Sequence, residues 1–486
     1  MNDHKPLVLL SHHFHQEDAS AGQSQCDCAC PENGFALSTP PVSRRAPLQH
    51  ARLHMQPLPG DHTLMFNAQR EGGVAVLNPP ARQIWERFRA PRTLDAAGDS
   101  DARRAARVMA EAGLLEPPDA TVQPRVRASQ TLSVWLHVTN ECNLRCSYCY
   151  INKTSARMSA ATGRAAIDAI FRSARKGNMQ RVRVKFAGGE PTLNLKLVLD
   201  LHEYARDRAA EAGIGLEAVI LSNGVALGER SIRALKARGI QVMISLDGVG
   251  AMHDRQRPFA NGTGSFPWVD RALDRLDRQG VRPFVSVTVS DRNIDGLPQV
   301  VSYLLDRDLP FNLNFFRDND CATPFHGLRA EQARLIAALH ETFDIIEARL
   351  PARSLLGSLI DRARLDQAHD KPCSVGDSYL VVTHTGHIAK CQMEVERPIT
   401  DIAADDPLRL VQIDRTGVQN VSVDEKEGCR DCAWKYWCGG GCPVLTYRAT
   451  GRYDVKSPYC NVYKALYPRA LRLEGLRLLK LSGALQ

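Results

Sequence analysis

The chain has 486 residues, of which 44% are hydrophobic and 24% are charged, and its formal net charge is +8. This length is too great for one hydrophobic core and predicts two to four domains. The charge is modest for the length and gives no indication of a nucleic-acid partner. No apolar run is long enough to span a membrane, and residues 6–10 lack the flanks of a signal peptide, so we expect a cytoplasmic protein without membrane contact.

Fourteen cysteines are the unusual feature of the composition. In a chain without a secretion signal, thiols are typical of metal binding or catalysis rather than of disulfides. These thiols are also clustered, whereas disulfides that staple a core would be spread along the chain. The groups are Cys26, Cys28 and Cys30; Cys142, Cys146 and Cys149; Cys321 alone; and seven between Cys373 and Cys460.

Residues 1–48 mix His, Ser and Pro around the run CDCAC with little periodicity, and we expect a disordered extension. Three cysteines at alternate positions can point the same way on a strand but not on a helix. Binding of a labile metal, capture of a peptide thiol and no function at all are the interpretations that stay open for Cys26, Cys28 and Cys30.

Residues 49–120 have the pattern of a small winged-helix-like domain. The stretch HTLMFNAQREGGVAVLN predicts two short strands around a turn at Gly72 and Gly73. The stretch PARQIWERF predicts a helix with one apolar face, and ARRAARVMAEAG predicts a second helix that ends at Gly113. Residues 119–130 are expected to be a linker.

From residue 128 to 328, strands alternate with helices, which is the pattern of a parallel sheet with crossover helices. The six candidate strands are TLSVWLHVT, RVRVKFA, LEAVILS, QVMISL, RPFVSVTVS and FNLNFF. Six strand–helix units suit a partial (β/α)6 barrel better than a closed eightfold one. In such a barrel the chemistry is expected on the loops that follow the C-terminal ends of the strands.

The loop CNLRCSYCY directly follows the first of these strands. It supplies three thiols, Cys142, Cys146 and Cys149, and no fourth cysteine is near them in the sequence. Three thiolates can hold three irons of a cubane and leave the fourth iron open to a ligand from outside the protein. A structural zinc site normally has four Cys or His ligands, so zinc held by these thiols with His137 is the alternative.

The spacing of these cysteines, with Tyr148 before the third, resembles the signature of radical S-adenosylmethionine (SAM) enzymes. Similar motifs follow the next strands in the family's order: GGEP at 188–191, LSNG ending at Gly224, and SLDG at 245–248. The resemblance covers residues 131–320. It implies a [4Fe-4S] cluster on the three cysteines, with SAM bound to the open iron.

The same resemblance implies residue roles and a reaction. The residues implied to contact SAM are Tyr148, Gly188, Gly189, Glu190, Ser245 and Arg257. An electron from the reduced cluster would cleave SAM, and the resulting 5′-deoxyadenosyl radical would abstract hydrogen from an unactivated carbon. The reaction implies an electron donor such as flavodoxin or ferredoxin. It identifies no catalytic side chain.

Residues 329–369 predict a helical linker, and residues 370–486 hold the second cysteine field, ending in a helix over 463–481 with one packed and one solvated face. Two zinc ribbons are one interpretation of these cysteines. The complete pattern instead resembles the SPASM extension, which carries auxiliary [4Fe-4S] clusters in peptide-modifying radical SAM enzymes. The resemblance implies three clusters in all, with one auxiliary cluster on Cys429, Cys432, Cys438 and Cys460 and the other on Cys373, Cys391 and Cys442.

The fourth ligand of the second auxiliary cluster is not given by the pattern. Two interpretations remain: the fourth iron of this cluster is free to bind substrate, or Cys321 is its ligand. Anaerobic sulfatase-maturating enzymes, which the chain also resembles, carry an aspartate base directly after the cysteine that corresponds to Cys391. Here Gln392 stands at that position, and a neutral amide cannot take up the proton.

Residues 49–120 resemble the pyrroloquinoline-quinone peptide-chaperone family, also called the RiPP recognition element (RiPPs are ribosomally synthesised, modified peptides). Such a domain binds a leader peptide by adding it as a strand to a small sheet. Residues 74–77 and the helix around 103–108 are the expected binding surfaces. A docking domain or a DNA-binding wing is the alternative.

Together the resemblances predict a radical SAM/SPASM peptide maturase that binds a precursor peptide and forms a thioether or carbon–carbon cross-link. One alternative is an enzyme that, like anaerobic sulfatase maturases, forms formylglycine on a protein substrate. An alternative from another class is a zinc-stabilised protein that binds peptide or DNA.

Overall fold

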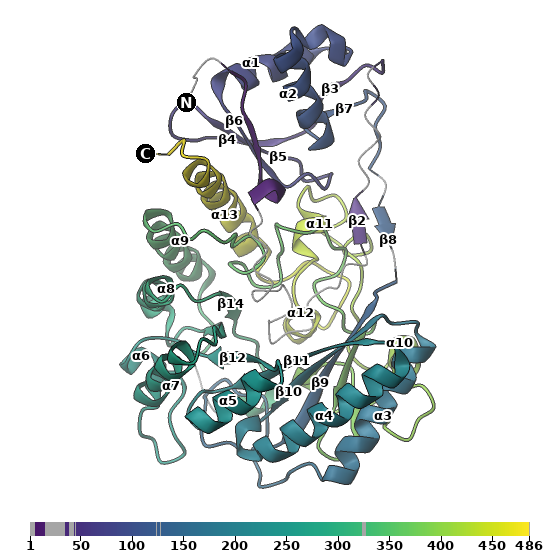
Figure 1. The fold of residues 1–486 in the computed structure, drawn as a ribbon, viewed down its shortest axis with the longest axis vertical. Coiled ribbons are helices and arrows are strands. Elements are labelled where there is room, and N and C mark those ends of the chain that lie inside the picture. Colours follow the sequence, from purple (N-terminus) through teal and green to yellow (C-terminus); the bar gives the residue numbers. More distant parts are fainter. Residues whose placement is uncertain are drawn as a thin grey trace.

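The computed structural model describes the greater part of the chain, namely residues 5–14, 35–37, 43, 45–122, 124–126, 128–322 and 327–485. An N-terminal module lies at one end of an elongated molecule, the parallel sheet with its helices lies at the other, and the C-terminal region lies between them (Figure 1). Cys26, Cys28 and Cys30 fall outside the described residues. No helix in the described part combines the length and the apolar character needed to cross a bilayer.

A nine-stranded sheet forms the centre of the molecule, in the order β14-β13-β12-β11-β10-β9-β15-β16-β17. Strands β9 to β14 are parallel and lie in sequence order. Their bounds are Thr131–Thr139, Arg181–Gly188, Gly215–Ser222, Gln241–Ser245, Phe284–Val289 and Phe311–Phe315. All six predicted strands are present, and the partial (β/α)6 barrel is confirmed.

Helices cross over between these strands. They are α3 (Ala160–Lys176), α4 (Leu195–Ala212), α5 (Glu229–Ala237), α6 (Ala251–Gln256), α7 (Phe266–Arg278) and α8 (Leu297–Asp306). Helix α3 begins where the sequence predicts, because the Ser159 side chain accepts a hydrogen bond from the Thr162 N–H. Its apolar stripe, which includes Ile167 and Ile170, is buried.

The C-terminal region contains β15 (Tyr379–Val382), β16 (His387–Ala389), β17 (Thr400–Asp401), α10 (Pro407–Ile413), α11 (Lys435–Cys438), α12 (Pro443–Thr450) and α13 (Cys460–Leu481). It shares the sheet of the barrel, because β15 pairs in parallel with β9 and extends that sheet. All four residues of β15 are buried. An isolated hairpin of this size could not bury them by itself.

Two helical predictions differ from the structure. In the predicted linker 329–369, only α9 (Gln332–Ala348) is helical, since Pro351 disfavours helical backbone just before it. Helix α13 has no broad solvated face, because it packs on both α9 and the N-terminal sheet. Even its polar residues Glu474 and Arg477 are buried, where they pair at 2.6 Å.

The N-terminal module has a four-stranded antiparallel sheet in the order β1-β6-β5-β4. Its elements are β1 (Val8–Leu10), β4 (His54–Pro57), β5 (Thr63–Phe66), β6 (Val74–Leu77), α1 (Pro79–Glu86), α2 (Ser100–Glu111), and a ladder of β3 (Gln49–His50) with β7 (Leu115–Glu116). Strand β1 lies within the predicted disordered extension. Its Leu9 and Leu10 are only 5% and 2% exposed, because they fill apolar surface that β6 would otherwise leave open. A further strand pair, β2 (Phe35–Leu37) with β8 (Pro124–Val126), connects this module to the barrel.

Candidate functional site

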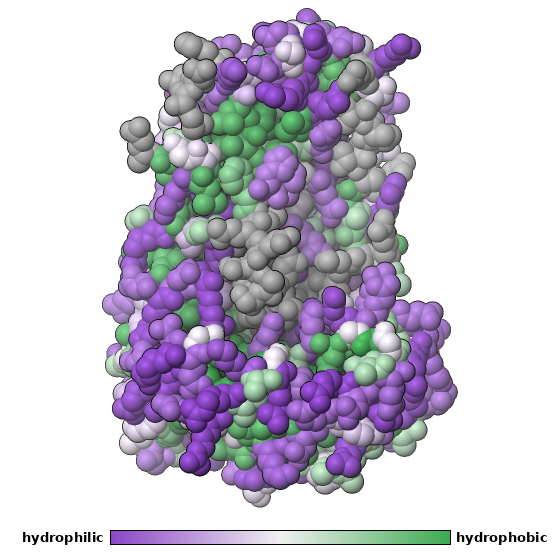
Figure 2. Space-filling view, in the orientation of Figure 1, coloured by the Kyte–Doolittle hydropathy of each residue, from purple (hydrophilic) through white to green (hydrophobic). Residues whose placement is uncertain are grey.

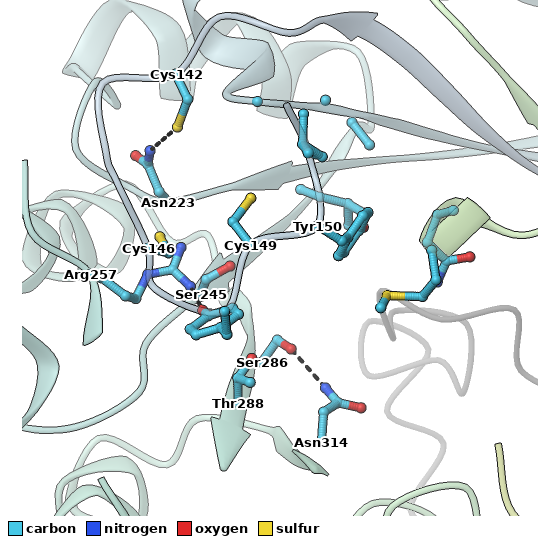
Figure 3. A pocket seen from close by; sticks show the side chains of 18 of the residues that line it. Cys142, Cys146, Cys149, Tyr150, Asn223, Ser245, Arg257, Ser286, Thr288 and Asn314 are labelled. Carbon is cyan, nitrogen blue, oxygen red and sulfur yellow. Dashed lines mark hydrogen bonds between the residues drawn. The ribbon is translucent and has the colours of Figure 1, made fainter. Parts of the chain in front are cut away.

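The three thiols of the first cysteine loop face one cavity at the C-terminal ends of the barrel strands (Figure 3). The cavity encloses about 1170 Å³, including its open mouth. The loop is fixed by backbone bonds from Arg145 to Pro258 O and from Ser147 to Gln256 O, at 2.8 and 3.2 Å. The structure therefore brings Cys142, Cys146 and Cys149 together at one cavity.

The electrostatics of this loop favour a bound cation or cluster. Burial, followed by the charge of Cys146, raises the pKa of Cys142 to about 12. Burial also raises the pKa of Cys146, against the lowering effect of Arg257. Because metals bind thiolates and not thiols, a positively charged partner is needed to hold these sulfurs deprotonated at neutral pH. An iron–sulfur cluster fits that requirement.

In the zinc alternative, the three thiols of this loop need His137 as a fourth ligand. His137, the fourth ligand in that alternative, bonds through Nε2 to Asn140 Oδ1 at 2.7 Å, and burial lowers its pKa to about 4.

Gly188 and Gly189 let the end of β10 lie directly against the cysteine loop. Gly188 has a φ of 145°, and a Cβ added there would lie 2.3 Å from Thr139 O. A Cβ on Gly189 would lie 2.2 Å from Glu141 O. The Gly189 N–H donates to Thr139 O at 2.7 Å. Both glycines line the cavity, and this close backbone approach explains why neither position tolerates a side chain.

Replacing Gly189 with alanine should destabilise the fold, because the added methyl group would push the backbone of Glu141 away. Overpacking of this kind costs about 1–3 kcal/mol, and the displaced cysteine loop should also retain less iron. Chemical denaturation and iron analysis would measure both effects. Gly228→Ala is the matched control, since nothing lies within 4 Å of a Cβ added there. Equal stability and iron content in the two variants would contradict the close approach.

Glu190, predicted to contact SAM, is a buried positioning residue in the structure. Its carboxylate accepts hydrogen bonds from the Asn223 N–H at 2.7 Å, the Ser222 hydroxyl at 2.9 Å and the Thr192 N–H at 3.1 Å. Burial raises its pKa, and the bond from Asn223 opposes this rise. Glu190 therefore ties the end of β10 to the end of β11, where Asn223 reaches Cys142 Sγ at 3.9 Å.

Tyr148 and Arg257 meet in one buried network beside Cys146. The Tyr148 hydroxyl donates to Asp247 Oδ2 at 2.7 Å, and Arg257 bonds to the same hydroxyl and pairs with Asp247 at 3.4 Å. Burial alone would lower the pKa of Arg257, but the charges of Cys146, Tyr148 and Asp247 raise it well above its ordinary value. Ser245, at the end of β12, lines the same cavity.

Several polar residues that line the cavity were missed by sequence reasoning. They are Asn223, Ser286, Thr288, Asn314, Arg317 and Arg362. A signal existed in β13, where Val285 and Val287 alternate with Ser286 and Thr288. Strands that are buried on both faces are normally apolar throughout, so this alternation indicates a polar barrel interior. Ser286 accepts a hydrogen bond from Asn314 of β14 at 2.9 Å (Figure 3).

The second cysteine field forms two groups of thiols. Burial raises the pKa of Cys429 to about 11, and neighbouring Cys438, Cys460 and Cys432 add to the rise. Burial likewise raises the pKa of Cys391 to about 12, and neighbouring Cys442 and Cys373 add to it. These neighbours divide the seven cysteines into the same two sets that the SPASM resemblance implies.

Lys426 lies between the two sets and is fully buried. Burial lowers its pKa, while Cys429, Cys438, Cys373 and Cys442 all raise it, so its ammonium is close to both groups. Among the described residues it forms no ion pair with a carboxylate, and its nearest acceptor is Gly439 O at 3.5 Å. A buried ammonium needs a negative partner, and thiolates of metal-bound cysteines are the groups placed to supply it.

Cys321 lies at the first cysteine loop rather than at the second auxiliary group. Its thiol donates to Tyr150 O at 3.5 Å. Burial and then the charge of Cys149 raise its pKa. By contrast, Cys442 faces Arg317 and Arg362, which lower its pKa despite burial. Cys321 is therefore not placed to complete the set of Cys373, Cys391 and Cys442.

Comparison with known proteins identifies one domain of the chain. Residues 136–300 match the family model of the radical SAM superfamily. The chain thus carries a radical SAM domain, and radical SAM enzymes use a [4Fe-4S] cluster and SAM. The described geometry of the first cysteine loop agrees with this assignment.

Three relatives show how far the sequence similarity extends. An uncharacterised protein of Methanocaldococcus jannaschii is 31% identical over 172 residues, which are 35% of this chain and 57% of that protein. A cysteine-type anaerobic sulfatase-maturating enzyme of Clostridium novyi is 23% identical over 326 residues, 63% of this chain and 85% of the enzyme. The sporulation killing factor maturation protein SkfB of Bacillus subtilis is 23% identical over 315 residues, 62% of this chain and 71% of that protein.

The fold is similar to that of native anSMEcpe with bound AdoMet and a Cp18Cys peptide. The TM-score is 0.59 at 19% identity, over 73% of this chain and 99% of that chain. At this identity the likeness concerns the fold alone. It confirms the predicted class, an α/β protein with a radical SAM barrel.

Proposed function

We propose that the chain is a radical SAM/SPASM maturase that modifies a ribosomally synthesised precursor peptide. One observation carries the proposal: two residues of the second cysteine field, directly after Cys391, line the same cavity as the first cysteine loop. Gln392 and Met393 reach this cavity together with Cys142, Cys146 and Cys149. A substrate in it would therefore lie between the radical site and the group of Cys373, Cys391 and Cys442.

In this proposal, Cys142, Cys146 and Cys149 hold a [4Fe-4S] cluster, and the two sets of the second field hold auxiliary clusters. The first cluster, with SAM bound, would supply the one-electron cleavage that starts hydrogen abstraction. The chain's own residues orient and shield the reactants. Tyr148 and Arg257 are held by Asp247 beside Cys146, and Ser245 borders the same space.

Gln392 favours cross-link formation over formylglycine formation. Its Oε1 accepts a hydrogen bond from the Tyr379 hydroxyl at 3.0 Å, and it stands directly after Cys391. The amide can donate a hydrogen bond to a substrate but cannot take up a proton. A thioether or carbon–carbon bond needs no strong base at this position if an auxiliary cluster accepts the second electron. The formylglycine reaction is the second candidate, since sulfatase-maturating enzymes are among the relatives.

The N-terminal module is proposed to recognise the leader of the precursor peptide. Its sheet of four short strands with two helices suits strand addition, and SkfB is named as a maturation protein. A cytoplasmic location and an electron donor such as flavodoxin or ferredoxin complete the proposal.

Co-expression with a candidate precursor peptide, sought as a short open reading frame beside the gene, tests the function. We expect the peptide to lose two hydrogens for each bond formed, with the site located by tandem mass spectrometry. A bridge between two residues would support cross-linking. Conversion of one Cys or Ser to an aldehyde would support formylglycine formation. An unmodified peptide, together with colourless and zinc-loaded protein, would overturn both enzymatic proposals.

A further inference from the structure

The outer edge of β6 is already occupied by the chain's own N-terminus. We propose that this edge is a peptide-docking site, that residues 5–14 are its resident occupant, and that an extended peptide with the same side-chain pattern competes for it. This inference deepens the proposed function, since it concerns how a leader reaches the module. It names the partner as an uncharged apolar strand followed by a hydroxyl residue.

Backbone pairing seats the segment as an added strand. Strand β1 runs antiparallel to β6, with Val8 opposite Leu77, Leu9 opposite Val76 and Leu10 opposite Ala75. On its other side β6 pairs with β5. Without residues 8–10, β6 would be an edge strand with unpaired backbone groups, which is the usual template for a peptide strand. The predicted leader surface at residues 74–77 is therefore not available while β1 is in place.

Side chains on both faces of β1 are bound by different parts of the protein. Leu10 packs in the module's own core with Trp85 of α1 and Met109 of α2. Leu9 points the opposite way and belongs to the large core that continues into α13. Figure 2 shows hydrophobic surface gathered over this N-terminal sheet. The site thus selects apolar side chains at successive positions, with leucine fitting both faces.

Polar contacts fix the two ends of the segment. The Asn78 side chain accepts from the Leu7 N–H and donates to Lys5 O, both at 2.9 Å. At the other end, the Ser11 hydroxyl accepts from the Val74 N–H at 3.1 Å. The hydrogen bonds to residues 5 and 7 involve only their backbone, and the Leu7 side chain packs against the large core, so an apolar side chain is also favoured at position 7. A hydroxyl at the position of Ser11 is the one specific polar requirement.

The opposite edge of the sheet is a poorer candidate. Strand β4 lies against α13, where Gln56 Nε2 donates to Pro468 O at 2.9 Å and Arg472 donates to Pro57 O at 3.2 Å. Pro57 also has no N–H for a ladder. The edge at β6 is therefore the one built to hold a strand. Because residues 5–14 are attached to the same chain, their effective concentration is in the millimolar range, and they would weaken the binding of a separate peptide.

Cleavage of the full-length chain tests this competition without removing the segment before folding. A protease site is inserted between residues 15 and 34, which lie outside the described part, and the folded protein is then cut and diluted. The probe is a fluorescent peptide with the sequence of residues 5–14, KPLVLLSHHF. We expect it to bind the cut protein, and to bind the uncut protein on the order of 100-fold more weakly. A control probe with aspartate at the two positions that correspond to Leu9 and Leu10 should bind neither the cut nor the uncut protein.

A second variant covers the case in which cutting damages the fold. Leu9→Asp/Leu10→Asp in the uncut chain should release β1, so that the probe binds without cleavage and the amides of β6 exchange hydrogen faster. Equal binding of the probe to cut and uncut protein would overturn the proposal, as would no binding to either released form. A dimer that exchanges its N-terminal strands would assign the site to a second copy instead and would also overturn it. None of these readouts needs clusters or SAM, so a failure here is distinct from a failure of the proposed activity.

Discussion

Replacing Cys142, Cys146 and Cys149 together with alanine should abolish reductive cleavage of SAM. These three thiols face the cavity from one loop. No other cysteine among the described residues lines the cavity. Without these three cysteines, a [4Fe-4S] cluster has no protein ligands at this site. We expect release of 5′-deoxyadenosine to fall to background in anaerobic assays with dithionite and SAM. Iron bound by the second cysteine field should remain.

Cys321→Ala is the matched control for this variant. Its thiol lies beside the same loop, 3.5 Å from Tyr150 O, but outside the cavity. It should retain SAM cleavage and the full iron content. Cleavage that persists in the triple variant would refute the site. Loss of iron in the Cys321 variant would show that this thiol is a ligand after all.

Lys426→Met should have opposite effects on the metal-free and the iron-loaded protein. In iron-loaded protein the ammonium balances thiolate charge of both auxiliary groups, so its loss should destabilise the fold by about 3–5 kcal/mol, as for one partner of a buried ion pair. In metal-free protein with neutral thiols, a buried cation has no negative partner, and its removal should be neutral or stabilising. Thermal unfolding of the variant, with and without reconstituted iron, would measure the change in stability of both forms.

Lys435→Met is the control for Lys426. Lys435 lies in the same region but pairs with Asp424 at 2.7 Å near the surface. A partly exposed pair of this kind contributes about 0–1 kcal/mol, with no dependence on iron. If Lys426→Met had the same sign in both forms of the protein, the auxiliary thiols would not carry the charge that we assign to them.

Local pattern was enough to predict the barrel. Alternating strands and helices specify a parallel sheet, and all six strands lie where the sequence places them. The two cysteine sets of the second field were implied by the resemblance to the SPASM extension; their thiols are neighbours in the structure, and their ligation of clusters stays a prediction. The zinc alternative for the first loop was open in the sequence, and the match of residues 136–300 to the radical SAM superfamily favours the cluster.

Other features depended on contacts between distant segments. Strand β1 is three residues long, too short for a periodic signal, and it is a strand because β6 offers a free edge 67 residues away in the sequence (Leu9 to its partner Val76). The arginines of α13 suggest a solvated face when the sequence is considered alone. In the structure the helix packs against α9 and the N-terminal sheet. Glu190 and Asp247 are carboxylates whose roles depend on which donors lie around them.

The sequence by itself determined the chemistry that the chain can hold: three thiols on one loop, seven more in a second field, and a partial parallel barrel to carry them. Spacing within a loop and alternation along a strand are local, so they can be read without the fold. Only the tertiary structure decided that the two residues after Cys391 line the cavity of the first cysteine loop, that Lys426 lies between the auxiliary sets, and that residues 8–10 fill the edge of β6. Each of these depends on long-range packing, which brings together residues that no local pattern connects.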